Sequence, residues 1–266
     1  MNIALIRSDA RQTLQHAKVS PFLVTACFLA ILYAVLICYN VFTIWYSYAI
    51  DASPGGLDAM NRVGRYYTFA TVSPILVTLF SNSAYGLYSG YTLSLSRDAN
   101  ADLRTLLQGF RLFGKLLFLT LLISFFTFLW ACLFVIPGFI AMYRYRLSYH
   151  ILFDHPEYSA FQALEESKRL TYGHKLDLFM LDLSFFYFYL LAFGGNIVMN
   201  FPFYYPLENP GMAADLKFFL LGTVLIMVGE FLFLPHLRTS LTQAYLSILE
   251  EDTSPADGSG PWLPEP

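Results

Sequence analysis

Three ionisable side chains lie close together in an otherwise apolar part of the sequence. The segment YRYRLSYHILFD, residues 143–154, contains Arg144, Arg146 and His150 directly after a long uncharged stretch. Two carboxylates, Asp182 and Glu230, interrupt later apolar stretches. Ionisable groups inside a membrane usually face the interior of a helix bundle, where they pair with one another or line a path for an ion or solute. These five residues therefore form the candidate site, an intramembrane polar cluster.

The depth of each charge along its helix indicates which of them can meet. With a rise of about 1.5 Å per residue, Arg146, Asp182 and Glu230 each lie roughly 8 to 10 Å from the cytoplasmic end of its apolar segment. We therefore expect Arg146 to face inward and to pair with Asp182, with Glu230 or with both. Arg144 lies about 200° around the helix from Arg146 and must point elsewhere. The alternative is that each charged side chain extends separately to the nearby lipid headgroups.

The sequence contains none of the motifs that would indicate catalysis or a metal centre. No HExxH, GxSxG or glycine-rich phosphate-binding loop is present. Asp154 beside His155 is more simply explained as the cap of a turn before Pro156. We therefore expect no enzyme activity, no cofactor and no metal. The net charge of −3 is too small to indicate a nucleic-acid partner. The cysteines are expected to be buried free thiols: Cys27, Cys38 and Cys132.

The elements that must position these charges are membrane-spanning helices. Apolar residues make up 56 % of the chain and charged residues only 13 %, against roughly 25 % charged residues in soluble domains. Several uncharged stretches exceed the length of about 20 residues that a helix needs to cross the hydrocarbon layer. We predict an all-α polytopic membrane protein with one integral membrane domain, residues 1–250, and six spans: 22–46, 67–95, 114–136, 138–153, 176–199 and 217–235.

Amphipathic segments between the spans predict helices that lie on the cytoplasmic surface of the membrane. Apolar residues recur at three- and four-residue steps in 2–17, 100–111 and 160–172, as in helices that lie in the interface. A fourth interfacial helix is expected at 237–250, after Pro235 has ended the last span.

The segment 160–172 carries its own start and stop signals. Ser159 and Gln162 have the spacing of a capping box. Glu165 and Arg169 are four residues apart, which favours an ion pair along the helix, and Gly173 suits the position just beyond the end.

The distribution of basic residues predicts the orientation. With six spans, most lysines and arginines fall on the side of the N-terminus, so the positive-inside rule makes both termini cytoplasmic. This count requires residues 138–153 to cross, because otherwise Lys168, Arg169 and Lys175 would lie outside. Residues 251–266 show no hydrophobic pattern and are expected to be a disordered tail.

Several short motifs resemble those of an uncharacterised family of bacterial integral membrane proteins, catalogued as domain of unknown function 975. The resemblance covers roughly residues 86–250. Arg146 and His155 depart from the usual serine and asparagine of that pattern. The resemblance implies a helical protein of the bacterial cytoplasmic membrane, without an established activity. The matching motifs are Ile136-Pro137-Gly138, Tyr143-Arg144-Tyr145, Asp154-His155-Pro156, Ala163-Leu164, Ser167, Gly173-His174-Lys175 and Leu181-Asp182-Leu183-Ser184-Phe185.

Three functions are compatible with these sequence features. The first is a non-catalytic accessory protein that binds lipid, a protein partner or a second copy of itself through its interfacial helices. The second is a small transporter, because small and polar residues form a stripe along the second span, although close helix packing explains that stripe as well. The third and weakest is an intramembrane enzyme. A polar cavity centred on the charges would favour transport, and a closed bundle would favour the accessory protein.

Overall fold

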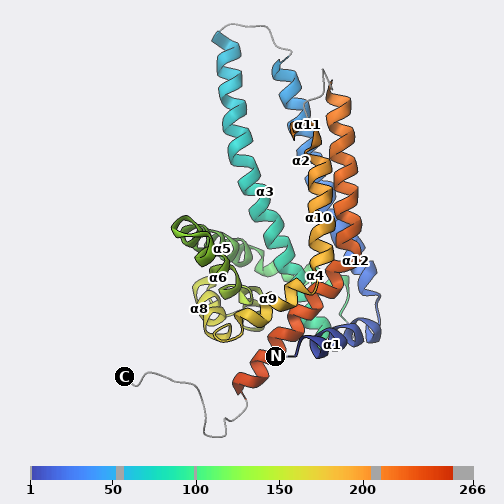
Figure 1. Ribbon diagram of the computed structural model, residues 1–266, viewed down its shortest axis with the longest axis vertical. Helices are drawn as coiled ribbons and strands as arrows, with labels where there is room; N and C mark the ends of the chain where they lie inside the picture. The colour runs from blue at the N-terminus through green and yellow to red at the C-terminus, as the bar shows by residue number, and fades with distance from the viewer. Residues whose placement is uncertain (1, 52–56, 99–100, 205–210, 254–266) are drawn as a thin grey trace.

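The computed structural model describes residues 2–51, 57–98, 101–204 and 211–253, and every element in these ranges is a helix (Figure 1). The expected all-α class is therefore confirmed for this part of the chain. Most of the tail predicted at 251–266 lies outside the described residues.

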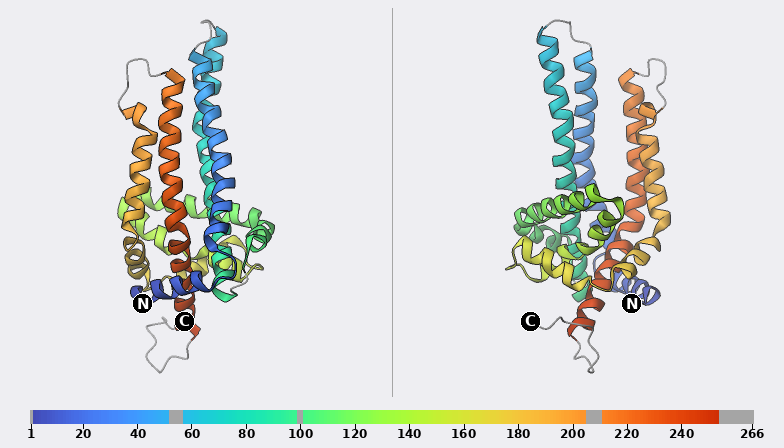
Figure 2. Two further views of the ribbon diagram at one scale, coloured as in Figure 1. Left: turned by 90° about the vertical axis from the view of Figure 1, so that its right-hand side faces the viewer. Right: turned by 60° about the vertical axis from the view of Figure 1, so that its left-hand side comes forward.

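Four helices run along the long axis of the molecule: α2 (Pro21–Asp51), α3 (Leu57–Arg97), α10 (Phe186–Met199) and α12 (Gly211–Thr253) (Figures 1 and 2). Helices α2 and α3 are antiparallel partners. The hydroxyls of Thr25 and Tyr88 are 2.7 Å apart, and those of Tyr39 and Ser73 are 2.8 Å apart. These polar contacts join the two helices at two points along their length. Such contacts are expected between apolar helices, which have no hydrophobic drive to associate in lipid.

Helices α10 and α12 approach each other closely because glycines face each other. A Cβ atom on Gly222 would lie 2.5 Å from the carbonyl oxygen of Gly195 and 2.5 Å from the backbone nitrogen of Met199. Only a residue without a side chain fits there. The short helix α11 (Phe201–Tyr204) follows α10 before the chain turns into α12.

Three helical stretches are long and apolar enough to cross a membrane, or up to four if a bent pair counts as one span. They are Pro21–Ile50, Leu103–Leu133 and Gly211–Thr253; the bent pair is α9 (Lys175–Leu183) with α10, at 64°. These helices indicate a membrane-embedded protein, but the six predicted spans are not confirmed. The predicted span 67–95 forms part of α3, whose serines, threonines and tyrosines make it less apolar than the others.

The predicted span 138–153 is wrong as a single helix. Helix α6 (Val135–Arg144) and α7 (Ser148–Asp154) are separated by a turn. The hydroxyl of Ser167 donates to the carbonyl of Arg144 at 3.0 Å and accepts from the amide of Leu147 at 3.2 Å. A side chain from another helix thus satisfies backbone groups that a continuous helix would pair internally, which makes the break stable.

The predicted span 114–136 is a helix, α5 (Phe113–Leu133), but it does not run along the long helices. It lies crosswise to them and packs with α6 as a hairpin (Figures 1 and 2). The tip of this hairpin is apolar and exposed: Leu133, Phe134, Val135 and Ile136 are each at least 63 % accessible. Hydrophobicity alone could not distinguish this arrangement from a crossing.

The amphipathic segments form helices gathered at one end of the molecule: α1 (Ile3–His16), α4 (Leu103–Gln108) with the 3₁₀ turn η1 (Gly109–Leu112), and α8 (Ala160–Leu170) (Figure 2). Helix α1 buries Ile6, Ala10 and Leu14 and packs against α12. That these helices lie flat on a membrane remains a prediction.

The capping box predicted for α8 is confirmed. The Ser159 hydroxyl accepts from the Gln162 amide, and the Gln162 side chain accepts from the Ser159 amide. Gly173 has a φ of 87°, as expected beyond the helix end. The predicted pair of Glu165 with Arg169 is wrong, because Arg169 contacts Glu166 at 2.7 Å and Asp252 at 2.8 Å instead.

The predicted break at Pro235 is also wrong. Helix α12 continues through Pro235 to Thr253, so residues 237–250 extend the last long helix and do not form a separate interfacial one. Proline costs a helix one backbone hydrogen bond, and the packing of this helix against α1, α2, α3 and α10 outweighs that cost.

Candidate functional site

Arg146 and Asp182 form an ion pair inside the molecule. An Nη of Arg146 lies 2.6 Å from Oδ1 of Asp182, whose side chain is only 10 % exposed. The second carboxylate oxygen accepts the Tyr143 hydroxyl at 3.1 Å. Helix α6 and the following turn thus supply both donors, and α9 supplies the acceptor. Asp182 is one of the two partners that the equal depth of the charges predicted for Arg146. Each oxygen of Asp182 has a hydrogen-bond donor.

Glu230 does not take part in that pair. Both of its oxygens lie 2.8 Å from the Tyr85 hydroxyl, so α3 rather than α6 supplies the partner. The guanidinium of Arg238 lies over the Tyr85 ring, 5.4 Å from its centroid. Arg238 belongs to the cluster, but the sequence reasoning placed it in a cytoplasmic segment after Pro235. In a continuous helix, residues eight apart share a face, which is the signal that relates Arg238 to Glu230.

His150 is fully buried in α7, outside the helices that are long enough to cross a membrane. Its Nε2 lies 3.1 Å from the Thr242 hydroxyl, and its ring packs 5.4 Å from that of Tyr245. Burial lowers the pKa of His150 to about 3, and the positive charges of Arg238 and Arg146 add to the shift. The imidazole is therefore neutral near pH 7.

The side chain of Arg144 forms no ion pair with Asp182 or Glu230 among the described residues. The contribution of Arg144 is its backbone carbonyl, which accepts hydrogen bonds from the Ser167 and Thr171 hydroxyls at 3.0 and 3.2 Å. The five candidate residues thus separate into an ion pair, a tyrosine-bound carboxylate, a neutral histidine and a residue at the helix break.

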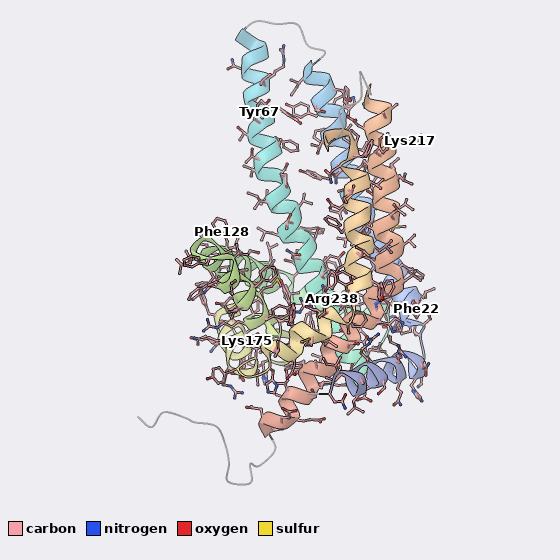
Figure 3. All side chains as sticks on the ribbon, viewed as in Figure 1. Phe22, Tyr67, Phe128, Lys175, Lys217 and Arg238 are labelled. Atoms are coloured by element: carbon pink, nitrogen blue, oxygen red, sulfur yellow. The ribbon has the colours of Figure 1, made fainter. Side chains whose placement is uncertain are left out.

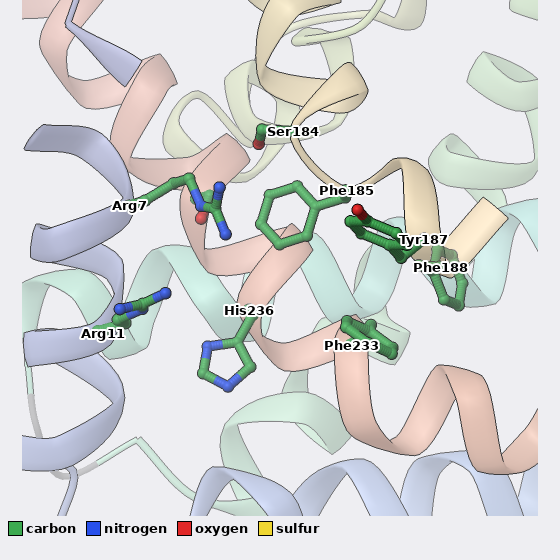
Figure 4. Close-up of a pocket in the computed structure, with 9 residues that line it drawn as sticks. Arg7, Arg11, Ser184, Phe185, Tyr187, Phe188, Phe233 and His236 are labelled. Carbon is green, nitrogen blue, oxygen red and sulfur yellow. The ribbon is translucent and has the colours of Figure 1, made fainter. Parts of the chain in front are cut away.

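A pocket of about 350 Å³ lies beside this cluster, at the break between α9 and α10 (Figure 4). Arg7 and Arg11 of α1 form one wall, and residues of α10 and α12 form the other. The Arg7 guanidinium stacks on the Phe185 ring, 5.0 Å from its centroid. No carboxylate occurs among the residues that line it: Arg7, Arg11, Ser184, Phe185, Tyr187, Phe188, Phe233, His236 and Ser240.

The ion pair and the pocket share one structural support. Helix α9 ends just after Asp182, where the Ser184 hydroxyl donates to the Leu181 carbonyl at 2.6 Å and the Phe185 amide donates to the Asp182 carbonyl at 2.9 Å. These bonds terminate α9 and turn Phe185 into the pocket wall. Sequence reasoning missed the pocket, because nothing in the amphipathic pattern of 2–17 indicated what its arginines would face.

Among the described residues, no group of three or more histidine, cysteine or acidic side chains is close enough to hold a metal ion. The three cysteines are free thiols, but the predicted burial is wrong, because Cys27 is half-buried and Cys38 and Cys132 are exposed.

The fold and the site together define an all-helical protein with apolar helices typical of membrane proteins. Residues 133–252 match the model of the family described as Protein of unknown function (DUF975). The matched segment contains all five residues of the predicted cluster and confirms the resemblance read from the motifs at 136–185. No curated protein and no solved structure matches the chain.

Proposed function

We propose that this is a non-catalytic membrane protein that works by binding lipid at the end of the molecule that carries α1 and α8. One observation carries the proposal: the open site is a basic and aromatic pocket at the flank, whereas the buried carboxylates already have donors. A pocket with one polar wall and one aromatic wall suits a molecule that has a polar head and an apolar chain.

The proposed topology follows from the positions of the helix ends. Helices α2, α3, the bent pair α9–α10 and α12 cross the bilayer, and the α5–α6 hairpin enters it without crossing. Helix α3 is included because it returns the chain beside α2 to the end that carries α1 and α4 (Figure 1). Both termini are then cytoplasmic, in the plasma membrane of a bacterium.

Transport is the less favoured alternative, because the polar residues of α3 have structural roles. Ser83 is buried and donates to the Thr120 hydroxyl at 3.0 Å, and Ser89 is buried and donates to the Tyr85 carbonyl at 3.3 Å. Helix packing accounts for these residues without a solute path.

Native mass spectrometry of the protein extracted in mild detergent tests the proposal. We expect the wild-type protein to retain phospholipid, because a pocket of this charge holds a headgroup through solubilisation. A protein that retains no lipid, and that passes solutes when reconstituted into vesicles, would show that transport is the correct function.

A further inference from the structure

The proposed function leaves the chemical class of the lipid open, and the pocket at the α9–α10 break supplies it. We infer that this pocket binds the phosphate group of an anionic phospholipid, with Arg7 and Arg11 as its ligands. The inference rests on the proposed function and adds two ligand residues and the charge of the headgroup.

The charge of the pocket points to an anion. Arg7 and Arg11 are four residues apart in α1, so they lie on the same side of that helix and extend toward the same space (Figure 4). Within the described residues neither arginine forms an ion pair, and Arg7 stacks on Phe185. The imidazole of His236, which lines the same pocket, interacts electrostatically with both positive charges. Stacking on a ring leaves the N–H edge of a guanidinium free, and two such edges match the oxygens of a phosphate.

The position of α1 is fixed, so the arginines are held in place before any ligand arrives. Ile6, Ala10 and Leu14 are buried against the rest of the protein on one face of α1. On the opposite wall of the pocket, Phe185 and Phe188 are also buried. A preformed pocket of about 350 Å³ has the size of a small-molecule site and can take a headgroup but not a whole lipid.

The apolar side of the pocket indicates a lipid rather than free phosphate. Tyr187 lines the pocket and is 78 % exposed, and the flank beyond it presents Leu190 and Phe193, which are 53 % and 64 % exposed. An anion alone needs no such surface. An acyl chain attached to the bound phosphate would lie along it, which removes apolar area from water.

Lipid titration of the delipidated protein tests the site. The protein in mild detergent is titrated with phosphatidylglycerol, with phosphatidylcholine and with inorganic phosphate, and bound species are counted by native mass spectrometry. We expect the wild type to prefer phosphatidylglycerol. Loss of two charge-assisted contacts in Arg7→Gln/Arg11→Gln should weaken that binding by about tenfold or more.

A matched pair of arginines controls for net charge. Arg104 and Arg111 are exposed on α4 and η1 at the same end of the molecule and do not line the pocket. Arg104→Gln/Arg111→Gln removes the same charge and should leave phosphatidylglycerol binding within about twofold, since surface charges act weakly. Arg7→Lys/Arg11→Lys keeps the charge and loses the paired N–H edge, so a folded variant with intermediate affinity is expected even if the glutamine pair unfolds.

Each remaining outcome overturns a different statement. Equal weakening by both arginine pairs would show general attraction to a basic surface and reject the site. Inorganic phosphate that binds as tightly as phosphatidylglycerol and displaces it would make this a soluble-anion site. Phospholipid retained equally by the wild type and by Arg7→Gln/Arg11→Gln would reject the site but keep the proposed function. A wild type that binds neither lipid would reject the proposed function itself.

Discussion

At the residue scale, the ion pair between Arg146 and Asp182 joins the turn after α6 to α9 in the interior of the protein. A carboxylate and a guanidinium in low dielectric compensate each other, and removing one strands the other. Tyr143 adds a second donor to Asp182, so the carboxylate is fully used.

We expect Asp182→Asn and Arg146→Gln each to lower the free energy of unfolding by about 3 kcal/mol, because each leaves an uncompensated buried charge. The double variant should lose less than the sum. The melting temperature in detergent and the monodisperse fraction on size exclusion measure both effects. Arg144→Gln is the control and should stay within about 0.5 kcal/mol. Additive losses would show that the two charges do not interact.

The sequence predicted this pair but missed another member of the cluster. Depth along each helix is a local property, so Arg146 and Asp182 could be matched without knowing the fold. Arg238 could not, because its assignment depended on whether Pro235 ends a helix. Whether the helix continues through Pro235 is decided by the packing of α12 against other helices, and the presence of a proline in the sequence does not reveal that packing.

At the element scale, composition identified helices but not their directions. The stretch 116–143 is apolar enough for a crossing, yet α5 turns crosswise and α6 ends at Arg144. The turn depends on hydroxyls of Ser167 and Thr171 from α8, a long-range contact that no local pattern encodes. Amphipathic periodicity did better, since the helices at 3–16 and 160–170 begin and end within two residues of the predicted segments 2–17 and 160–172.

The contact of α10 with α12 gives a second stability prediction. Gly222→Ala places a methyl group against backbone atoms of the facing helix, so the helices must separate, at a cost of about 1 to 3 kcal/mol. Gly194→Ala, one residue from the contact, meets nothing within 4 Å and should be neutral or stabilising by up to about 1 kcal/mol. Melting temperatures compare the two. Equal behaviour would contradict the close approach.

At the scale of the whole molecule, the proposed four crossings and the six predicted from sequence differ at one accessible point. In the six-span arrangement, the connection near residue 137 faces the outside. In the proposed arrangement, the hairpin tip stays within the membrane, and both topologies keep the termini on the same side.

Cysteine labelling in intact cells distinguishes the two. In a background with Cys27, Cys38 and Cys132 changed to serine, we expect Met212→Cys to react with an impermeant maleimide and Ser8→Cys to react only after permeabilisation. Phe134→Cys should remain unlabelled in intact cells, because the tip lies in lipid. Strong external labelling at this position would restore the six-span topology, and labelling of Ser8→Cys from outside would reverse the orientation.

The crosswise hairpin has a consequence for the membrane around the protein. It lies beside the long helices only toward the end that carries α1 and α8, so the molecule is broader there than at its opposite end (Figure 3). In the proposed orientation, it displaces more lipid area from the inner leaflet than from the outer one. Such a wedge exerts unequal lateral pressure on the two leaflets, and the protein should therefore gather where the membrane curves to relieve it.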